Sequence, residues 1–298
     1  MSQTVRITDP RKPSAAGTIR AYVELTKPRI IELLLTTTLP AMVLAADGWP
    51  GWWLSIATLI GGTLSAAGAN VINQVMDSDI DRVMRRTRGR PIPSHRVGEE
   101  AAMVFGIVLG ILGFAWLLVT TNFLAASLST IAFLFYVIIY TLFLKRTSTQ
   151  NIVIGGAAGA IPPLVGWAAV TGSLSTPAWV LFGIIFFWTP PHFWALALRY
   201  DEDYKAAGVP MLPGIVGTAM TADHIVLYSF ATVGVSLLLV LWVGWIYFAA
   251  VVVLGAWLIA GAFHLRTNSD MAMRYFTATN GYLAGVFLAL AIDVLVLG

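Results

Sequence analysis

Long apolar stretches separated by short polar segments dominate this chain, and their lengths predict helices that cross a membrane. A hydrocarbon core of about 30 Å requires roughly 20 apolar residues in a helix. Nine stretches of suitable length occur, at about 27–46, 52–75, 101–120, 123–144, 152–170, 177–198, 223–243, 245–263 and 279–297. We therefore expect a multi-pass membrane protein that crosses the lipid bilayer nine times.

The composition supports a lipid environment. The 298 residues are 58% hydrophobic and only 11% charged, and the mean hydropathy is +0.79. Soluble domains carry about a quarter charged residues, so this chain has too few charges to cover a globular surface in water. The sequence contains no cysteine. Disulfides, thiolate metal sites and a cysteine nucleophile are therefore excluded.

The basic residues all fall on one side of the predicted membrane. Of the 18 Lys and Arg residues, six precede or begin the first span, six follow the second, and two follow each of the fourth, sixth and eighth. Cytoplasmic loops carry the Lys and Arg excess. We expect a plasma-membrane protein with a cytoplasmic N-terminus and a C-terminus on the opposite side. Residues 1–22 are then a cytoplasmic tail, and residues 23–298 form the transmembrane domain.

Small residues and prolines suggest how the spans pack. The stretches "GGTLSAAGAN" (61–70) and "GGAAGA" (155–160) allow close helix approach in lipid. We expect Pro162-Pro163 to break the fifth span and Pro190-Pro191 to break the sixth. Broken membrane helices persist where the freed backbone is buried or lines a cavity. The predicted fold is an all-α helical bundle around a central polar cavity open toward the cytoplasmic side.

A cluster of oxygen ligands ends the second span. Asn73, Asp77 and Asp81 stand at i, i+4 and i+8, and each four-residue step turns a helix by only about 40°. The three side chains therefore form one stripe. Mg²⁺ takes one or two carboxylates and completes its shell with water and substrate phosphates, which favours a magnesium site. The alternative is that these aspartates merely solvate a helix end and pair with nearby arginines.

Basic side chains and a second acidic cluster extend this interpretation. The loop after the second span carries several arginines that can bind phosphate, Arg86 and Arg90 among them, and Lys145 and Arg146 follow the fourth span. Some of these cations serve only as topology signals. The sixth span ends in "LRYDEDYKAAGVPMLP" (198–213) on the same predicted side. Two carboxylate clusters that hold Mg²⁺ around a diphosphate suit ionisation of an allylic diphosphate, and hence prenyl transfer.

At these residues the chain resembles the UbiA-type intramembrane prenyltransferases. The pattern N-x-x-x-D-x-x-x-D at 73–81 with a second Asp-rich loop carries the resemblance. The stretches "SDIDRVMRRTRGRP" (78–91), "LKRTSTQNIVIGGAAGAIPPLVGW" (144–167), "WTPPHFWALAL" (188–198) and "DYKAAGVPMLP" (203–213) narrow it to members that farnesylate heme. It covers roughly residues 20–295. The resemblance implies farnesyl transfer from farnesyl diphosphate to a vinyl group of heme B, with addition of water, giving heme O and diphosphate.

The resemblance also implies roles for individual residues. Asn73, Asp77, Asp81 and Asp203 are the implied metal-binding and catalytic residues, with one or two Mg²⁺ ions as cofactor. The candidate diphosphate-binding residues are Arg86, Arg90, Lys145, Arg146, Arg199 and Lys205. Arg199 occupies the position where many relatives have the first Asp of a second D-x-x-x-D motif. Either Asp201 or Glu202 substitutes for it, or Arg199 binds phosphate directly.

His192, within "PPHFW", is a candidate heme contact, either as an axial ligand or as a base near the acceptor vinyl group. The alternative is that it satisfies backbone carbonyls freed by the prolines. No nucleic-acid partner is expected. Downstream heme-modifying or oxidase-assembly membrane proteins are candidate partners.

Two rival functions remain open at this point. One is a UbiA-type enzyme acting on an aromatic acid or quinone precursor, which shares the aspartate chemistry. The other is a transporter or heme-handling membrane protein. The acidic residues lie at helix ends and not near the bilayer centre, where transport sites lie, which weighs against transport.

Overall fold

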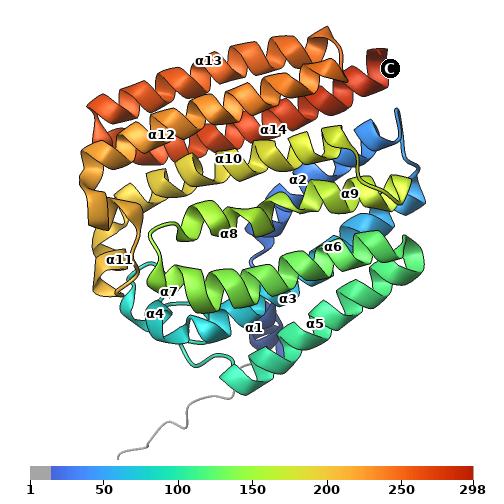
Figure 1. Ribbon diagram of the computed structural model, residues 1–298. Coiled ribbons are helices and arrows are strands. Elements are labelled where there is room, and N and C mark those ends of the chain that lie inside the picture. Colours follow the sequence, from blue (N-terminus) through green and yellow to red (C-terminus); the bar gives the residue numbers. More distant parts are fainter. Residues whose placement is uncertain (1–14, 298) are drawn as a thin grey trace, which may run out of the picture.

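The computed structural model is an all-helical bundle, as the sequence predicts (Figure 1). It describes residues 15–297, including the side chains of all of these except 29–30 and 32–35. Residues 1–14 of the expected N-terminal tail lie outside the described part. The helices are α1 (Ala15–Thr26), α2 (Pro28–Ala45), α3 (Trp52–Met76), α4 (Ser78–Val83), α5 (Glu99–Thr120), α6 (Phe123–Leu134), η1 (Phe135–Leu144), α7 (Lys145–Thr147), α8 (Asn151–Ala160), α9 (Pro162–Thr171), α10 (Thr176–Arg199), α11 (Asp201–Ala206), α12 (Leu212–Leu238), η2 (Leu239–Leu241), α13 (Trp245–Thr267), η3 (Ser269–Met271) and α14 (Ala272–Leu297).

Eight helical segments are long and apolar enough to cross a membrane. They are Trp52–Met76, Glu99–Thr120, Phe123–Thr147, Asn151–Thr171, Thr176–Arg199, Leu212–Leu241, Trp245–Thr267 and Ser269–Leu297. The first predicted span corresponds to α2, in which Thr36–Ala45 is the described apolar part. Eight of the nine expected spans are thus confirmed, and the ninth stays a prediction. The chain is a multi-pass membrane protein.

The two proline pairs behave differently. The fifth span is broken as expected, because α8 ends at Ala160 and α9 begins at Pro162. The expected break in the sixth span is wrong, because α10 continues from Thr176 to Arg199 with Pro190 and Pro191 inside it. A proline inside a helix removes one backbone hydrogen bond and crowds the preceding turn. Packing of α10 against α8, α12 and α14 offsets this cost and keeps the helix continuous.

Glycines let α3 and α5 pack in close contact, which confirms the expected tight packing of "GGTLSAAGAN". A Cβ atom added to Gly68 would lie 2.6 Å from the backbone oxygen of Gly106, and one added to Gly106 would lie 3.1 Å from the oxygen of Gly68. A Cβ atom added to Gly156 in "GGAAGA" would lie 3.0 Å from the Thr189 side chain of α10. These contacts draw α8 toward α10 and α3 toward α5.

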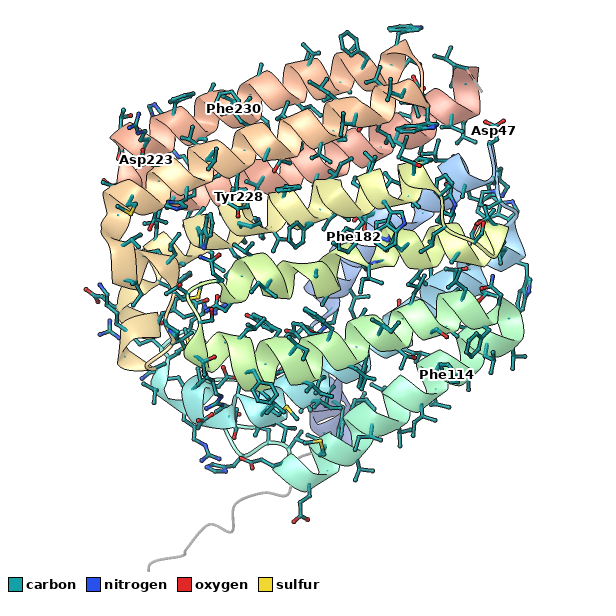
Figure 2. The ribbon with its side chains drawn as sticks, viewed as in Figure 1. Asp47, Phe114, Phe182, Asp223, Tyr228 and Phe230 are labelled. Carbon is teal, nitrogen blue, oxygen red and sulfur yellow. The ribbon has the colours of Figure 1, made fainter. Side chains whose placement is uncertain are left out.

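Short helices gather at one end of the bundle. Figure 1 shows α4, α7 and α11 together there, whereas Asp47 marks the opposite end in Figure 2. Ile80 of α4 packs in one apolar cluster with Tyr204 of α11 and Val209 beyond it. A pocket of about 290 Å³ between α4 and α11 is lined by Asp79, Ile80, Val83, Arg146, Ala206, Ala207, Gly208 and Val209. The central cavity open to the cytoplasmic side stays a prediction.

Candidate functional site

The predicted stripe of Asn73, Asp77 and Asp81 lies where α3 meets α4. The Asp77 N–H donates to the Asn73 carbonyl at 2.9 Å, and the Asp81 N–H donates to the Asp77 carbonyl at 2.8 Å. These bonds keep the helical spacing across the junction. The three residues do not share one helix, however, because α3 ends at Met76 and α4 begins at Ser78. Asp81 therefore lies in the first turn of a helix, where backbone N–H groups favour negative charge.

All three side chains are withdrawn from solvent. Asn73 is 3% exposed, and Asp77 and Asp81 are each 1% exposed. The Asn73 amide nitrogen donates to Asp77 Oδ2 at 2.8 Å, so the first two members of the stripe touch. Asp77 Oδ1 has no hydrogen-bond partner among the described residues. A buried carboxylate oxygen without a partner is costly, and a ligand at this position removes the cost.

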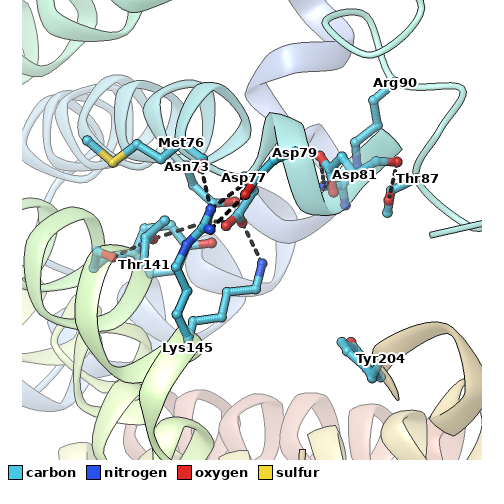
Figure 3. A network of polar contacts seen from close by, with 12 residues as sticks. Asn73, Met76, Asp77, Asp79, Asp81, Thr87, Arg90, Thr141, Lys145 and Tyr204 are labelled. Carbon is cyan, nitrogen blue, oxygen red and sulfur yellow. Dashed lines mark hydrogen bonds and ion pairs between the residues drawn. The ribbon is translucent and has the colours of Figure 1, made fainter. Parts of the chain in front are cut away.

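Cations surround the acidic side chains (Figure 3). Lys145 Nζ lies 2.5 Å from Asp77 Oδ2. The Arg90 Nη1 atom donates to both carboxylate oxygens of Asp81, at 2.8 and 2.7 Å. The ion pairs of the alternative interpretation are therefore present. They leave Asp77 Oδ1 open and place two of the predicted diphosphate-binding cations directly at the acidic stripe.

Asn73 has two polar partners that the sequence did not predict, Lys27 and Thr141. Lys27, treated only as a topology signal, donates through Nζ to Asn73 Oδ1 at 2.8 Å. It has a backbone φ of 53° at the start of α2, a conformation that is uncommon for residues other than glycine. Thr141 accepts a hydrogen bond from the Asn73 amide nitrogen at 3.1 Å. No local sequence signal points to either contact, because Lys27 and Thr141 lie 46 and 68 positions away from Asn73 in the sequence.

A π-helical segment, η1, delivers side chains to the stripe. Thr141 donates through its hydroxyl to the Tyr136 carbonyl five residues earlier, at 2.8 Å. The rings of Tyr136 and Tyr140 stack with centroids 5.3 Å apart, and Lys145 follows directly after the segment. Such π-helical turns within α-helices are frequent at functional sites. Here the segment presents one face, with Thr141 and then Lys145, to the end of α3.

Arg146 pairs with Asp79, which is not a member of the stripe. Its guanidinium bonds both oxygens of Asp79 at 2.8 Å and the Met76 carbonyl at 2.7 Å. The hydrogen bonds from Arg146 lower the pKa of Asp79 to about 2. Arg146 thus links the end of the Phe123–Thr147 span to α4 and lines the neighbouring pocket.

The second acidic cluster consists of Asp201, Glu202 and Asp203 in α11. It faces α4 but does not form one metal site together with the acidic stripe. Asp203 Oδ2 accepts a hydrogen bond from the Arg86 backbone N–H at 3.3 Å, and the Arg86 side chain donates to the Tyr204 hydroxyl at 3.3 Å. Burial raises the pKa of that hydroxyl. Among the described residues, no three Asp, Glu or His side chains lie close enough together to hold one metal ion.

The remaining predicted cations stay near α11. Lys205 pairs with Asp201 at 2.6 Å, and the Arg199 guanidinium lies 6.0 Å from the centroid of the Tyr200 ring. Both side chains are exposed. Neither contacts the acidic stripe in this structure.

The donor set of the first cluster fits one magnesium ion. It offers two buried carboxylates, one of them with an oxygen lacking any partner in the described chain, and an amide oxygen. Mg²⁺ usually takes one or two carboxylates and keeps water or phosphate oxygens at its other positions. Such an ion would be held by Asp77 and Asp81.

His192 occupies a separate aromatic environment on α10. It is 6% exposed, and its ring stacks between Trp188 and Phe276. It does not satisfy carbonyls freed by a helix break, since α10 is continuous. The adjacent Phe193 packs against the apolar cluster that contains Ile80, the sequence neighbour of Asp81.

Comparison with known proteins places this geometry in context. The UbiA prenyltransferase family profile matches residues 34–290. A protein named protoheme IX farnesyltransferase 1 from Saccharopolyspora erythraea is 52% identical over 287 residues, which is 95% of this chain and 92% of that protein. A protoheme IX farnesyltransferase from Mycobacterium avium is 50% identical over 299 residues, covering 98% of this chain and 97% of its own.

Solved structures share the fold at lower identity. A digeranylgeranylglyceryl phosphate synthase structure has a TM-score of 0.76 at 21% identity and covers 93% of this chain and 98% of its own. A UbiA homologue from Archaeoglobus fulgidus, solved with GPP and Mg²⁺, has a TM-score of 0.64 at 17% identity and covers 91% of this chain and 99% of its own.

Proposed function

The chain belongs to the UbiA prenyltransferase family, and from this premise we propose that it transfers a farnesyl group from farnesyl diphosphate to a vinyl group of heme B. The observation that carries the proposal is the identity of about 50% to proteins named protoheme IX farnesyltransferase along nearly the entire chain. The buried acidic stripe among cations supplies the chemistry that such a transfer requires.

The proposed reaction breaks the allylic C–O bond, the vinyl π bond and one O–H bond of water, and it forms a C–C bond and a C–O bond at the heme. The allylic C–O bond of farnesyl diphosphate breaks, and diphosphate leaves with the electron pair. The farnesyl carbocation bonds to the terminal vinyl carbon, and water adds to the vinyl carbon next to the porphyrin ring and loses a proton. The products are diphosphate, one proton and heme O, a heme with a hydroxyethylfarnesyl side chain.

Asn73, Asp77 and Asp81 are proposed to hold a Mg²⁺ ion, and Asp203 to contribute to a second ion across the site. Bound Mg²⁺ supplies charge neutralisation for the leaving diphosphate. Support comes from the partnerless oxygen of Asp77 and the burial of both carboxylates. A carboxylate in a water-poor site interacts strongly with cations, which favours binding of a metal-diphosphate complex there.

The cations at the stripe are proposed to bind the diphosphate. Lys145 and Arg90 now pair with Asp77 and Asp81, and Lys27 contacts Asn73. When the diphosphate enters with Mg²⁺, each of these cations gains a phosphate oxygen as a second partner. Positive and negative charges in the site therefore remain balanced. Arg86 beside Asp203 has the same role from the other cluster. Arg146, Arg199 and Lys205 stay proposals for the outer part of the site.

His192 is proposed to contact the heme.

The location is proposed to be the plasma membrane, with the N-terminus cytoplasmic, because the basic residues cluster at one end of the spans. Downstream heme-modifying or oxidase-assembly membrane proteins are proposed recipients of the product, since a farnesylated heme is too apolar to leave the bilayer readily.

An acceptor comparison tests the function. Purified protein in detergent is incubated with labelled farnesyl diphosphate, Mg²⁺ and either heme B or a phenolic acid, and products are resolved by mass. Farnesylated heme alone supports the proposal. Product with the phenolic acid but not with heme would move the assignment to a different acceptor.

A further inference from the structure

The imidazole of His192 is held so that a partner reaches it only in the plane of the ring. Trp188 covers one face, with ring centroids 4.3 Å apart at an interplanar angle of 19°. Phe276 of α14 stacks on the ring as well, at 4.2 Å and 25°. Phe193 meets it edge-on at 5.2 Å and 89°. Because the two stacked rings cover the faces of the imidazole, a ligand can reach its in-plane nitrogen lone pair only along the ring edge, part of which Phe193 occupies.

The hydrogen bonds of Thr279 determine which ring nitrogen carries the proton. Thr279 donates its single hydroxyl proton to the Phe276 carbonyl at 2.7 Å. The same hydroxyl oxygen lies 2.7 Å from His192 Nδ1. Because its proton is already used, the hydroxyl must accept from His192, so Nδ1 carries the hydrogen. In the neutral ring Nε2 then has the lone pair.

Thr279 is itself fixed to α10 through its backbone. The Trp188 indole N–H donates to the Thr279 carbonyl at 2.7 Å. The residue that orients His192 is therefore anchored by the residue that stacks on it. The side-chain hydroxyl and the backbone carbonyl act independently, so a change at the hydroxyl leaves the Trp188 contact intact.

The surroundings suit a neutral imidazole that donates its lone pair to a metal. The hydrogen-bond partner of Nδ1 is an uncharged hydroxyl, and the stacked neighbours are Trp188 and Phe276. A buried imidazolium without a carboxylate partner is disfavoured. Histidines that ligate metals usually donate the other ring N–H to a fixed acceptor, which sets the tautomer and the ring orientation.

Resting on the proposed heme acceptor, we propose that His192 Nε2 is the axial ligand of the heme iron and that Thr279 is the positioning residue that holds it. Iron ligation places the porphyrin against α10 and α14. Phe193, next in the chain, packs with the apolar cluster that contains Ile80, so the proposed heme position is connected through this cluster to α4, the helix that carries Asp81. His192 thereby selects a metalloporphyrin over an aromatic acid as acceptor.

Resonance Raman spectra of the full-length protein with ferrous heme B test this assignment. The wild type shows an iron–histidine stretching band, and His192→Ala loses it. Thr279→Val keeps the backbone carbonyl and the side-chain shape but removes the acceptor of Nδ1–H. We expect the band to move to lower frequency and the heme Kd to rise about tenfold. Thr279→Ser restores both. The matched control is Thr277→Val on the exposed side of α14, whose hydroxyl bonds only the Met273 carbonyl.

Each result bears on the assignment separately from turnover. Absence of the band in the wild type, or its persistence in His192→Ala, overturns ligation by His192. An unchanged band and Kd in Thr279→Val overturn the role of Thr279. If the wild type shows the band but makes no farnesylated heme, the proposed function fails while the ligand assignment stands. If farnesylated heme forms without the band, the ligand assignment fails alone.

Discussion

Lys27 and Asn73, 46 positions apart in sequence, meet through a hydrogen bond of 2.8 Å from the Lys27 ammonium to the Asn73 amide oxygen. This contact places the Lys27 side chain, from the start of α2, at the first member of the acidic stripe. Lys27 has a left-handed backbone conformation there. Strained residues of this kind cluster at functional sites, which agrees with a role beyond topology.

We expect Lys27→Met to raise the KM for farnesyl diphosphate. A hydrogen bond to a charged group contributes about 1.5–3 kcal/mol, which corresponds to about 10- to 100-fold in affinity. Steady-state kinetics with varied farnesyl diphosphate measures the effect. Arg20→Gln is the matched control, because Arg20 also precedes α2 but its side chain is 82% exposed and pairs with Glu24. Equal KM values in wild type and Lys27→Met would remove Lys27 from the site.

We expect Asp77→Asn to abolish most prenyl transfer. The change keeps the shape, removes the charge and leaves Lys145 without its carboxylate partner. Metal-based charge stabilisation amounts to several kcal/mol, so kcat should fall at least about 100-fold. Asp79→Asn, two positions away with a 63% exposed side chain, should retain activity within about threefold. Diphosphate release that survives in Asp77→Asn contradicts the metal assignment.

We expect Gly68→Ala to destabilise the bundle. The new methyl group would lie 2.6 Å from the Gly106 backbone oxygen, so α3 and α5 must separate at a cost of about 1–3 kcal/mol. Thermal unfolding in detergent measures the change as a lower midpoint. Gly62→Ala on the same helix meets nothing within 4 Å and should leave the midpoint unchanged or higher. Equal behaviour of the two variants would show that the α3–α5 contact is not tight.

The contribution of the Asp79–Arg146 ion pair to stability should be lost in acid and should not change around neutral pH. Hydrogen bonds from Arg146 lower the folded-state pKa of Asp79 from 3.8 to about 2. A depressed pKa gives a contribution that is fully present above the unfolded value and is lost as pH falls through the folded one. The difference in thermal midpoint between wild type and Asp79→Asn should therefore be constant from pH 8 to about pH 5 and disappear toward pH 2. Because Asp79 is largely exposed, the difference should be small. A difference that changes between pH 8 and pH 6 would point to another group.

The span lengths and the local polar spacing were predictable from sequence, because both follow from helix geometry. Eight spans were found where hydropathy placed them, although Leu212–Leu241 begins well before the expected residue 223. The Asn73–Asp77 contact followed from a spacing of four residues. In contrast, the partners that complete the site come from distant spans. Thr141 reaches Asn73 from η1, whose turns are wider than those of an α-helix, and no periodicity in the sequence indicates this contact.

Two expectations were wrong for physical reasons that act between helices. Pro190 and Pro191 were expected to break the sixth span, but α10 stays continuous because α8, α12 and α14 pack around it. The acidic stripe was expected on one helix, but α3 ends at Met76. In α10, packing against the neighbouring helices overrides the helix-breaking tendency of proline.

The mass of the reaction product tests the central claim most directly. Wild-type protein is incubated with heme B, farnesyl diphosphate and Mg²⁺ in water enriched in ¹⁸O, and the extracted heme is analysed by mass spectrometry. The account predicts a heme that has gained one farnesyl group and one ¹⁸O hydroxyl group, with formation dependent on Mg²⁺ and lost in Asp77→Asn. Recovery of unmodified heme together with farnesol from hydrolysed farnesyl diphosphate would contradict it.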